Sequence, residues 1–113
     1  MPLVRDDAGF DERQASYSYE MIAAIYGILA AVKDLTLEQV RQLTGDIAFA
    51  LAAQLDGVTR MEYDGILIRP VLTFAPDSSA GPEEEPTLLH SSAGSALNEY
   101  VYGNLDDIAR EVE

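Results

Sequence analysis

The chain has no cysteine, no tryptophan, one histidine and one lysine. Without cysteine, disulfide bonds, thiolate catalysis and zinc sites built on cysteine are excluded. Basic residues are scarce as a class, because 7 lysines and arginines stand against 20 acidic residues, which gives a formal net charge of -13. A chain with this charge repels phosphate groups, so we expect no direct binding to nucleic acid.

Long hydrophobic runs are missing as well. The longest uncharged apolar run covers residues 21–32. A helix of that length spans about 18 Å, whereas the hydrocarbon core of a bilayer needs about 30 Å. The first residues show neither the cationic nor the apolar region of a secretory signal. We therefore predict a cytoplasmic protein that does not contact a membrane.

Motifs for catalysis or for cofactor binding are also absent. Nucleophilic catalysis needs a base, and His90 is the only imidazole in a chain without a Gly-x-Ser-x-Gly turn. Asp106 and Asp107 are neighbours on a predicted helix and diverge by about 100°, which is poor geometry for chelating one ion. We predict a protein that is not an enzyme and holds no cofactor or metal. An enzyme with a metal–carboxylate site is the weakest alternative.

The residues that are present predict one α+β domain over positions 1–113. A hydrophobic fraction of 48% is sufficient for a packed core. Residues 1–10 are predicted to form a loose arm, and Asp11 is predicted to cap the first helix. The apolar residues of this helix form two adjacent stripes, so we expect other elements to cover it on several sides. The stripes comprise Tyr19, Ile22, Tyr26, Leu29, Met21, Ile25, Ile28 and Val32.

A second helix is indicated by Thr36 and Gln39, which have the spacing of a capping box. Gly57 is predicted to end this helix. The short link between the two helices predicts an antiparallel helical hairpin at the N-terminal end of the fold. One face of the second helix is strongly apolar and is expected to be buried. It comprises Leu37, Val40, Leu43, Ile47, Leu51 and Leu55.

The pattern then changes to that of strands. Residues 58–63 and 66–74 are rich in β-branched and aromatic residues, and Asp64 and Gly65 between them predict a type I′ hairpin. Pro70 places the second strand at an edge or a bulge. Residues 75–87 predict a mobile acidic loop, and residues 88–90 a third short strand. A C-terminal helix follows, with an apolar stripe that continues past Gly103. The stripe comprises Leu97, Val101, Leu105, Ile108 and Val112.

Acidic residues are concentrated in the last third of the chain. Residues 76–113 hold 9 acidic residues and 1 basic residue, a net charge of -8. Carboxylates without internal counter-ions suit a basic protein partner. We therefore predict a protein-binding module that engages a cationic surface, such as a phage-type inhibitor that mimics nucleic acid. Solubility or adaptation to salt is the alternative explanation of the charge. The predicted binding residues are Glu83, Glu84, Glu85, Glu99, Tyr102, Asp106, Asp107 and Glu111.

Small residues recur every four positions in the first helix, at Ala23, Gly27 and Ala31. Such a stripe allows another backbone to approach closely, either the second helix of the same chain at Ala48 and Ala52 or a second copy. The second possibility supports an alternative function. In that alternative the chain is a structural or chaperone-like homo-oligomer, of the immunity, chaperone or virion-assembly type, with a homodimer as its simplest form.

Overall fold

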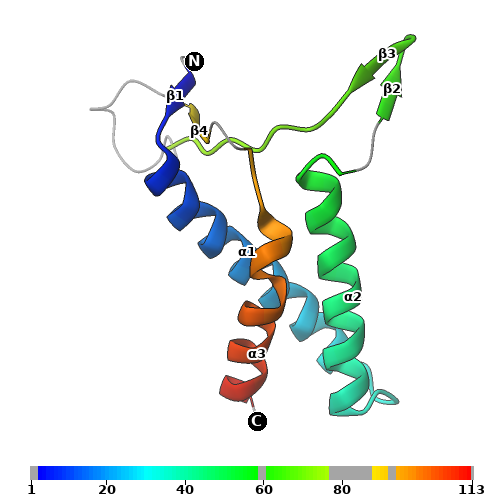
Figure 1. The fold of residues 1–113 in the computed structure, drawn as a ribbon. Helices are drawn as coiled ribbons and strands as arrows, with labels where there is room; N and C mark the ends of the chain where they lie inside the picture. Colours follow the sequence, from blue (N-terminus) through cyan, green and yellow to red (C-terminus); the bar gives the residue numbers. More distant parts are fainter. Residues whose placement is uncertain (1–2, 59–60, 77–87, 92–93, 113) are drawn as a thin grey trace.

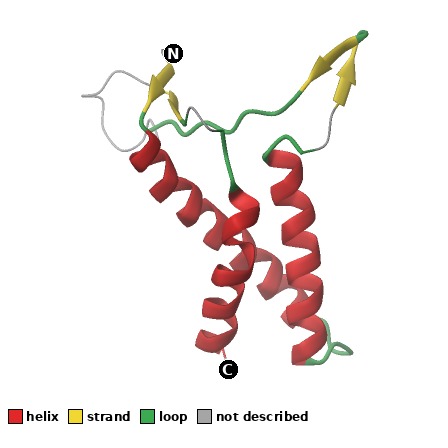
Figure 2. Cartoon of the chain, in the orientation of Figure 1, coloured by secondary structure: helices red, strands yellow, loops and turns green. Residues whose placement is uncertain are grey.

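The computed structural model describes residues 3–58, 61–76, 88–91 and 94–112. In these residues it shows three α-helices, one antiparallel β-hairpin and one parallel strand pair, which confirms the predicted α+β class (Figure 1). The strands lie at one end of the helices (Figure 2). In chain order the elements are β1 (Leu3–Arg5), α1 (Asp7–Ala30), α2 (Leu37–Leu55), β2 (Met61–Tyr63), β3 (Ile66–Ile68), β4 (Leu88–His90), a 3-10 turn (Leu97–Tyr100) and α3 (Val101–Val112).

Helix α1 begins earlier than predicted. Asp6 is its N-cap, and the Asp6 carboxylate accepts a hydrogen bond of 3.0 Å from the backbone N–H of Gly9. Asp11, the predicted cap, lies inside the helix. The earlier start places Phe10 on the buried side of the first turns, where its ring lies 5.3 Å from that of Phe74. Burial of this aromatic ring explains why the first of the two available caps is used.

The N-terminal residues also differ from the expected loose arm. Leu3–Arg5 forms β1, which pairs in parallel with β4 over three residues. The predicted third strand, Leu88–His90, is therefore confirmed, but its neighbour in the sheet is the N-terminal strand. Phe74 adds an isolated antiparallel bridge to Leu89, with backbone hydrogen bonds of 2.9 and 2.6 Å.

Both ends of α2 lie where the local sequence predicts them. Thr36 accepts a hydrogen bond of 3.1 Å from the backbone N–H of Gln39, and the Gln39 side chain accepts one of 2.9 Å from Thr36 N–H. This reciprocal pair is the predicted capping box. At the other end, Gly57 has φ +77° and donates to the carbonyl of Gln54, while Val58 donates to that of Ala53. These two bonds form a Schellman motif, which needs a left-handed residue at Gly57.

The predicted hairpin is confirmed, with shorter strands. Asp64 and Gly65 have φ +51° and +77°, as a type I′ turn requires. Residues 59–60 lie outside the described part of the chain, so β2 is described from Met61. Strand β3 ends at Ile68, just before Arg69 and Pro70, because proline cannot donate to a strand ladder.

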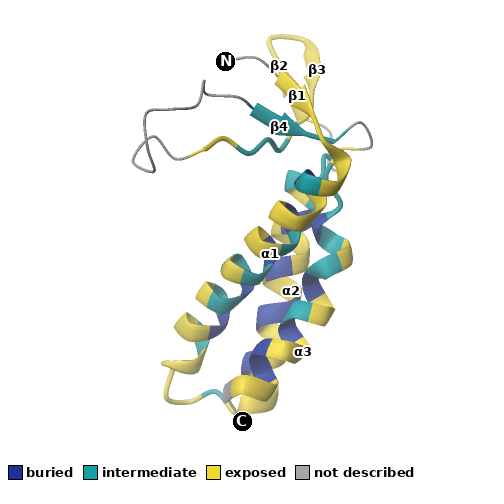
Figure 3. Cartoon of the chain, turned by 90° about the vertical axis from the view of Figure 1, so that its left-hand side faces the viewer, coloured by how far each residue is buried: buried dark blue, intermediate teal, exposed yellow. Residues whose placement is uncertain are grey.

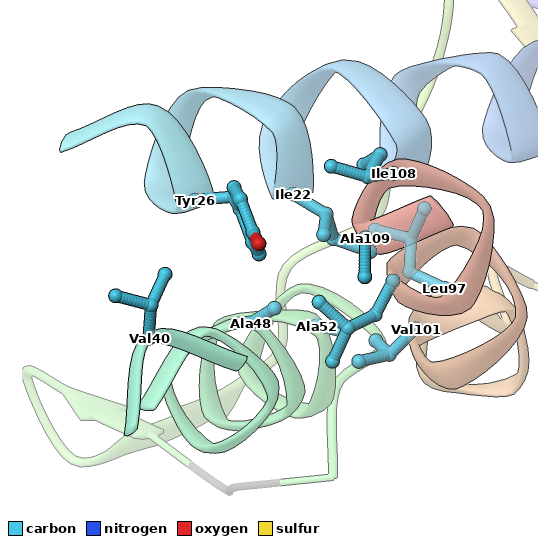
Figure 4. Packing of buried hydrophobic residues seen from close by; sticks show 10 residues of the cluster. Ile22, Tyr26, Val40, Ala48, Ala52, Leu97, Val101, Ile108 and Ala109 are labelled. Carbon is cyan, nitrogen blue, oxygen red and sulfur yellow. The ribbon is translucent and has the colours of Figure 1, made fainter. Parts of the chain in front are cut away.

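Helices α1, α2 and α3 meet in one core cluster. Side chains of Ile22 and Tyr26 on α1 point toward Ala48 and Ala52 on α2 (Figure 4). The 3-10 turn and α3 complete the cluster from one side of the α1–α2 pair, and α3 continues through Gly103 without a break. The members contributed by this C-terminal part are Leu97, Val101, Leu105, Ile108 and Ala109.

The side of α2 that is buried is not the predicted one. Val40 is buried, as expected, but the other buried positions are the small or polar residues Thr44, Gly45, Ala48 and Ala52. Helix α3 packs here at close range, since a Cβ added to Gly45 would lie 3.3 Å from the Leu105 side chain. Four large residues of the predicted face remain 38–57% exposed, namely Leu37, Leu43, Ile47 and Leu51.

Candidate interaction surfaces

The start of the C-terminal helical segment is held by two polar side chains. Asp56, the last residue before Gly57, accepts hydrogen bonds from the Ser95 hydroxyl at 2.6 Å and from the backbone N–H groups of Leu97 and Asn98 at 2.9 Å each. On the other side, the buried Gln14 accepts a hydrogen bond of 2.9 Å from the backbone N–H of Ala96. Together these contacts fix where α3 packs on the α1–α2 pair.

A third contact ties the same segment to α1. The Tyr100 hydroxyl donates a hydrogen bond to the Asp11 carboxylate, which also accepts one of 2.9 Å from the Gln14 amide. The bond with Asp11 raises the pKa of Tyr100 to about 12, because the carboxylate stabilises the protonated phenol. The same bond lowers the pKa of Asp11 below its ordinary value. Asp11, predicted as a helix cap, instead anchors the C-terminal segment.

The predicted acidic surface is divided among internal contacts. Asp106 forms an ion pair with Arg41 on α2, and Asp107 forms one of 2.8 Å with Arg110. Glu111 accepts a hydrogen bond of 2.8 Å from the hydroxyl of Tyr19 on α1. This contact raises the pKa of Tyr19 above its ordinary value. Three of the predicted binding carboxylates thus have partners within the chain, and they point toward different helices.

The other predicted binding residues are exposed or lie outside the described residues. Glu99 is exposed in the 3-10 turn. Tyr102 is 56% exposed, and its ring stacks on that of Phe49 with centroids 6.1 Å apart. The predicted mobile loop 75–87 falls mostly on residues 77–87, which lie outside the described residues. Its glutamates Glu83, Glu84 and Glu85 are among them.

The small-residue stripe of α1 faces open space rather than α2. Gly27 and Ala31 are exposed, and a Cβ added to Gly27 would meet no heavy atom within 4 Å. Ala23 is half-buried and packs against the core cluster. The predicted close packing of Gly27 against Ala48 and Ala52 is therefore wrong. Contact of the stripe with a second copy stays a prediction.

Large apolar side chains gather on the side of the α1–α2 pair that α3 does not cover. On α2, Leu43, Ile47 and Leu51 lie about 160–240° around the helix from Gly45, which faces α3. On α1, Met21 lies about 200° from Tyr19, which contacts α3 through Glu111. The predicted second stripe of α1 is on this side too, and Ile28 and Val32 are 71% and 45% exposed. The sequence pattern indicated that α1 needs cover here, and the described residues do not supply it.

An open groove of about 520 Å³ lies at the strand end of this apolar side. Its walls come from α1, α2, strand β2 and the segment that follows β3, and none of the lining residues carries a formal charge. They are Tyr17, Met21, Leu51, Gln54, Leu55, Met61 and Pro70. The lining of this groove is therefore mainly apolar.

The β2–β3 hairpin exposes a second apolar surface. The register pairs Met61 with Ile68 and Tyr63 with Ile66, which puts these four side chains on one face. They are 44–71% exposed. Figure 3 shows both strands exposed along their length, and Figure 1 shows the hairpin projecting away from the helices. The radius of gyration, 16.4 Å, is accordingly larger than the roughly 13 Å of a compact chain of this size.

A cluster of metal ligands is not found in the described part of the chain. No group of three or more histidine, aspartate or glutamate side chains is placed to hold a metal ion there. Among the described helices, none combines the length and the apolar character needed to cross a membrane. Comparison with protein-family models, with curated proteins and with solved structures finds no match for the chain.

Proposed function

We propose that the chain is a non-enzymatic structural subunit that assembles with copies of itself through its apolar surface. The observation that carries this proposal is the unoccupied side of the α1–α2 pair. Leu43, Ile47 and Leu51 form a continuous row on α2 and are 38–41% exposed, although smaller residues of the same helix are fully buried. Exposed apolar surface of this extent is typical of protein interaction sites.

Energetics support an association through these side chains. Complete burial of a leucine or isoleucine side chain contributes about 1.5–3 kcal/mol, so covering the exposed part of each contributes about 1 kcal/mol. An isolated two-stranded hairpin is only marginally stable in water, and it gains stability when a partner covers its apolar face. The helix pair and the hairpin are therefore both stabilised when a second copy covers their apolar side chains.

Sedimentation velocity over a concentration series, at low and high salt, tests this proposal. We expect a reversible oligomer. Each copy has a formal net charge of -13, so repulsion between copies opposes association. Added salt screens this repulsion, and the oligomer should therefore become more stable. A strict monomer at high protein concentration and high salt would rule the proposal out.

A second candidate function is binding of a cationic protein partner by the acidic C-terminal third. It is favoured by the net charge of -8 over residues 76–113. The internal partners of Asp106, Asp107 and Glu111 leave fewer carboxylates for such a surface. Reversal of Glu83, Glu84, Glu85, Asp106 and Asp107 to lysine should abolish binding to a basic partner. This binding should weaken as salt rises, which is the opposite of the dependence expected for self-association.

A further inference from the structure

The groove is concave and the hairpin projects, and both surfaces are apolar. The groove is concave, uncharged and lined mainly by side chains such as Met21, Leu51 and Leu55. The hairpin is a projecting element, and its apolar face presents Tyr63 and Ile66 near the turn. An exposed apolar projection and an exposed apolar groove on one chain are complementary when two copies meet.

The two surfaces are also continuous, which favours a two-fold arrangement. Met61 belongs to the apolar face of the hairpin and lines the groove as well. Both surfaces therefore lie on one side of the molecule. In a two-fold contact the same patch is used by both copies, so a patch that contains both a projection and a groove can pair with itself.

The available area matches what a stable dimer needs. The hairpin face and the groove side together expose nine large side chains by 38–71%. An aromatic side chain can bury about 150–250 Å² and a large aliphatic one less, so the exposed part of each of the nine offers on the order of 100 Å². Their sum, on the order of 900 Å², is close to the roughly 800 Å² per partner of a standard interface. The nine are Met61, Tyr63, Ile66, Ile68, Tyr17, Ile28, Leu43, Ile47 and Leu51.

Charge restricts which surface a second copy can approach. The chain is strongly acidic. Of its described acidic residues, Asp106, Asp107 and Glu111 belong to α3, on the other side of the α1–α2 pair, whereas Glu62 and Asp64 belong to the hairpin, with Glu62 on its opposite face and Asp64 in its turn. The groove carries no formal charge, and the four side chains of the hairpin face are uncharged too. The side chains that meet across this contact therefore add no charge repulsion of their own.

On these grounds, and resting on the proposed self-assembly, we propose that two copies exchange their hairpins. The apolar face of β2–β3 from each copy packs into the α1–α2 groove of the other, and Ile66 of one copy lies next to Leu51 of its partner. The exchange covers both apolar surfaces of both copies in one closed dimer.

Single cysteines test the exchange directly, because the chain has none of its own. Ile66→Cys and Leu51→Cys are made in separate copies of different mass, mixed and oxidised. Phe49→Cys is the matched control, since Phe49 and Leu51 are both 41% exposed on α2 but Phe49 stacks on Tyr102 of α3. We expect at least ten times more disulfide-linked heterodimer with Leu51→Cys than with Phe49→Cys. Equal yields, or linkage of Ile66→Cys only to itself, would overturn the exchange.

Aspartate variants at the same positions provide an independent measurement. Ile66→Asp and Leu51→Asp should each raise the dimer dissociation constant at least tenfold, whereas Phe49→Asp should change it less than threefold. Circular dichroism and thermal unfolding confirm that each variant is folded. If the wild-type chain dimerises but neither Ile66→Asp nor Leu51→Asp weakens the dimer, the hairpin exchange is wrong while self-assembly stands. A wild-type chain that never dimerises refutes both.

Discussion

Removal of the Asp56 carboxylate is expected to detach the C-terminal helical segment from the rest of the core. In the Asp56→Ala variant, the Ser95 hydroxyl and the backbone N–H groups of Leu97 and Asn98 lose their common acceptor. Two of these donors belong to the first turn of a helical segment, where the backbone has no acceptors of its own. The aspartate thus works as a cap supplied by a different helix.

The size of the effect follows from the bonds that are lost. A hydrogen bond to a charged group contributes about 1.5–3 kcal/mol, and a helix N-cap about 1 kcal/mol. Since the three bonds share one carboxylate, their contributions are not additive. We expect Asp56→Ala to lower the free energy of unfolding by about 2–3 kcal/mol. Asp56→Asn should lose about half as much, because its amide keeps one acceptor oxygen and turns a donor toward the other N–H group.

Urea denaturation followed by far-ultraviolet circular dichroism measures these differences. Asp46→Ala is the control, since Asp46 is an exposed acidic residue of the same helix with only weak contacts of 3.4 Å to Gln42. Its free energy of unfolding should stay within about 0.5 kcal/mol of the wild-type value. If Asp56→Ala is as mild as Asp46→Ala, the carboxylate does not hold α3 in place and this reasoning fails.

Three further predictions concern helix packing, a buried hydroxyl and pH. Gly27→Ala should stabilise the fold by up to about 1 kcal/mol, because its Cβ enters open space and alanine favours the helix. Gly45→Ala should be neutral or destabilising, because its Cβ would lie 3.3 Å from the Leu105 side chain of α3. If thermal unfolding shows that Gly45→Ala raises the melting temperature as much as Gly27→Ala, the close packing is contradicted. Tyr26→Phe should raise the melting temperature. The buried Tyr26 hydroxyl has no hydrogen-bond partner among the described residues, so removing it removes the cost of taking that group out of water. A lower melting temperature would argue against this. The pKa of Tyr100 is about 12 in the folded chain and about 10 in the unfolded chain. The contribution of Tyr100 to the free energy of unfolding is therefore present below about pH 10 and is lost between about pH 10 and 12. When tyrosine ionisation is followed by absorbance, Tyr100→Phe should lack the ionisation step with the highest pKa. An unchanged titration curve would refute this assignment.

Local features of the fold could be predicted from the sequence because their causes are local. The capping box of Thr36, the type I′ turn at Asp64 and Gly65, and the helix end at Gly57 each depend on a few neighbouring residues. The competition between Asp6 and Asp11 for the start of α1 could not be decided in this way. It depends on the packing of Phe10 against Phe74, which is distant in the sequence.

The buried face of α2 could not be predicted for a related reason. Periodicity identifies an apolar row that includes Ile47 and Leu51, but it does not reveal which neighbour the helix meets. Helix α3 packs against Gly45 instead, because a residue without a side chain allows the two helices to approach closely. Most of the strongest apolar row is thereby left exposed.

The candidate acidic site shows a similar limit. Counting charges along the chain identifies the acidic C-terminal third, but Asp106 and its partner Arg41 are 65 positions apart in the sequence. The contact of Glu111 with Tyr19 spans 92 positions. Such pairs become visible only when the helices are placed in space, so carboxylates that seem unpaired in the sequence prove to be engaged.

The parallel pairing of β1 with β4 has a consequence for the order in which the chain folds. It joins Leu3 to Leu88, so most of the chain must be looped before the pair can form. The capped α1–α2 pair, by contrast, forms between consecutive segments. Because closing a long loop costs more entropy than closing a short one, we expect α1 and α2 to associate before β1 pairs with β4. In hydrogen exchange, the amides of β1 and β4 should accordingly gain protection after those of α1 and α2 during refolding.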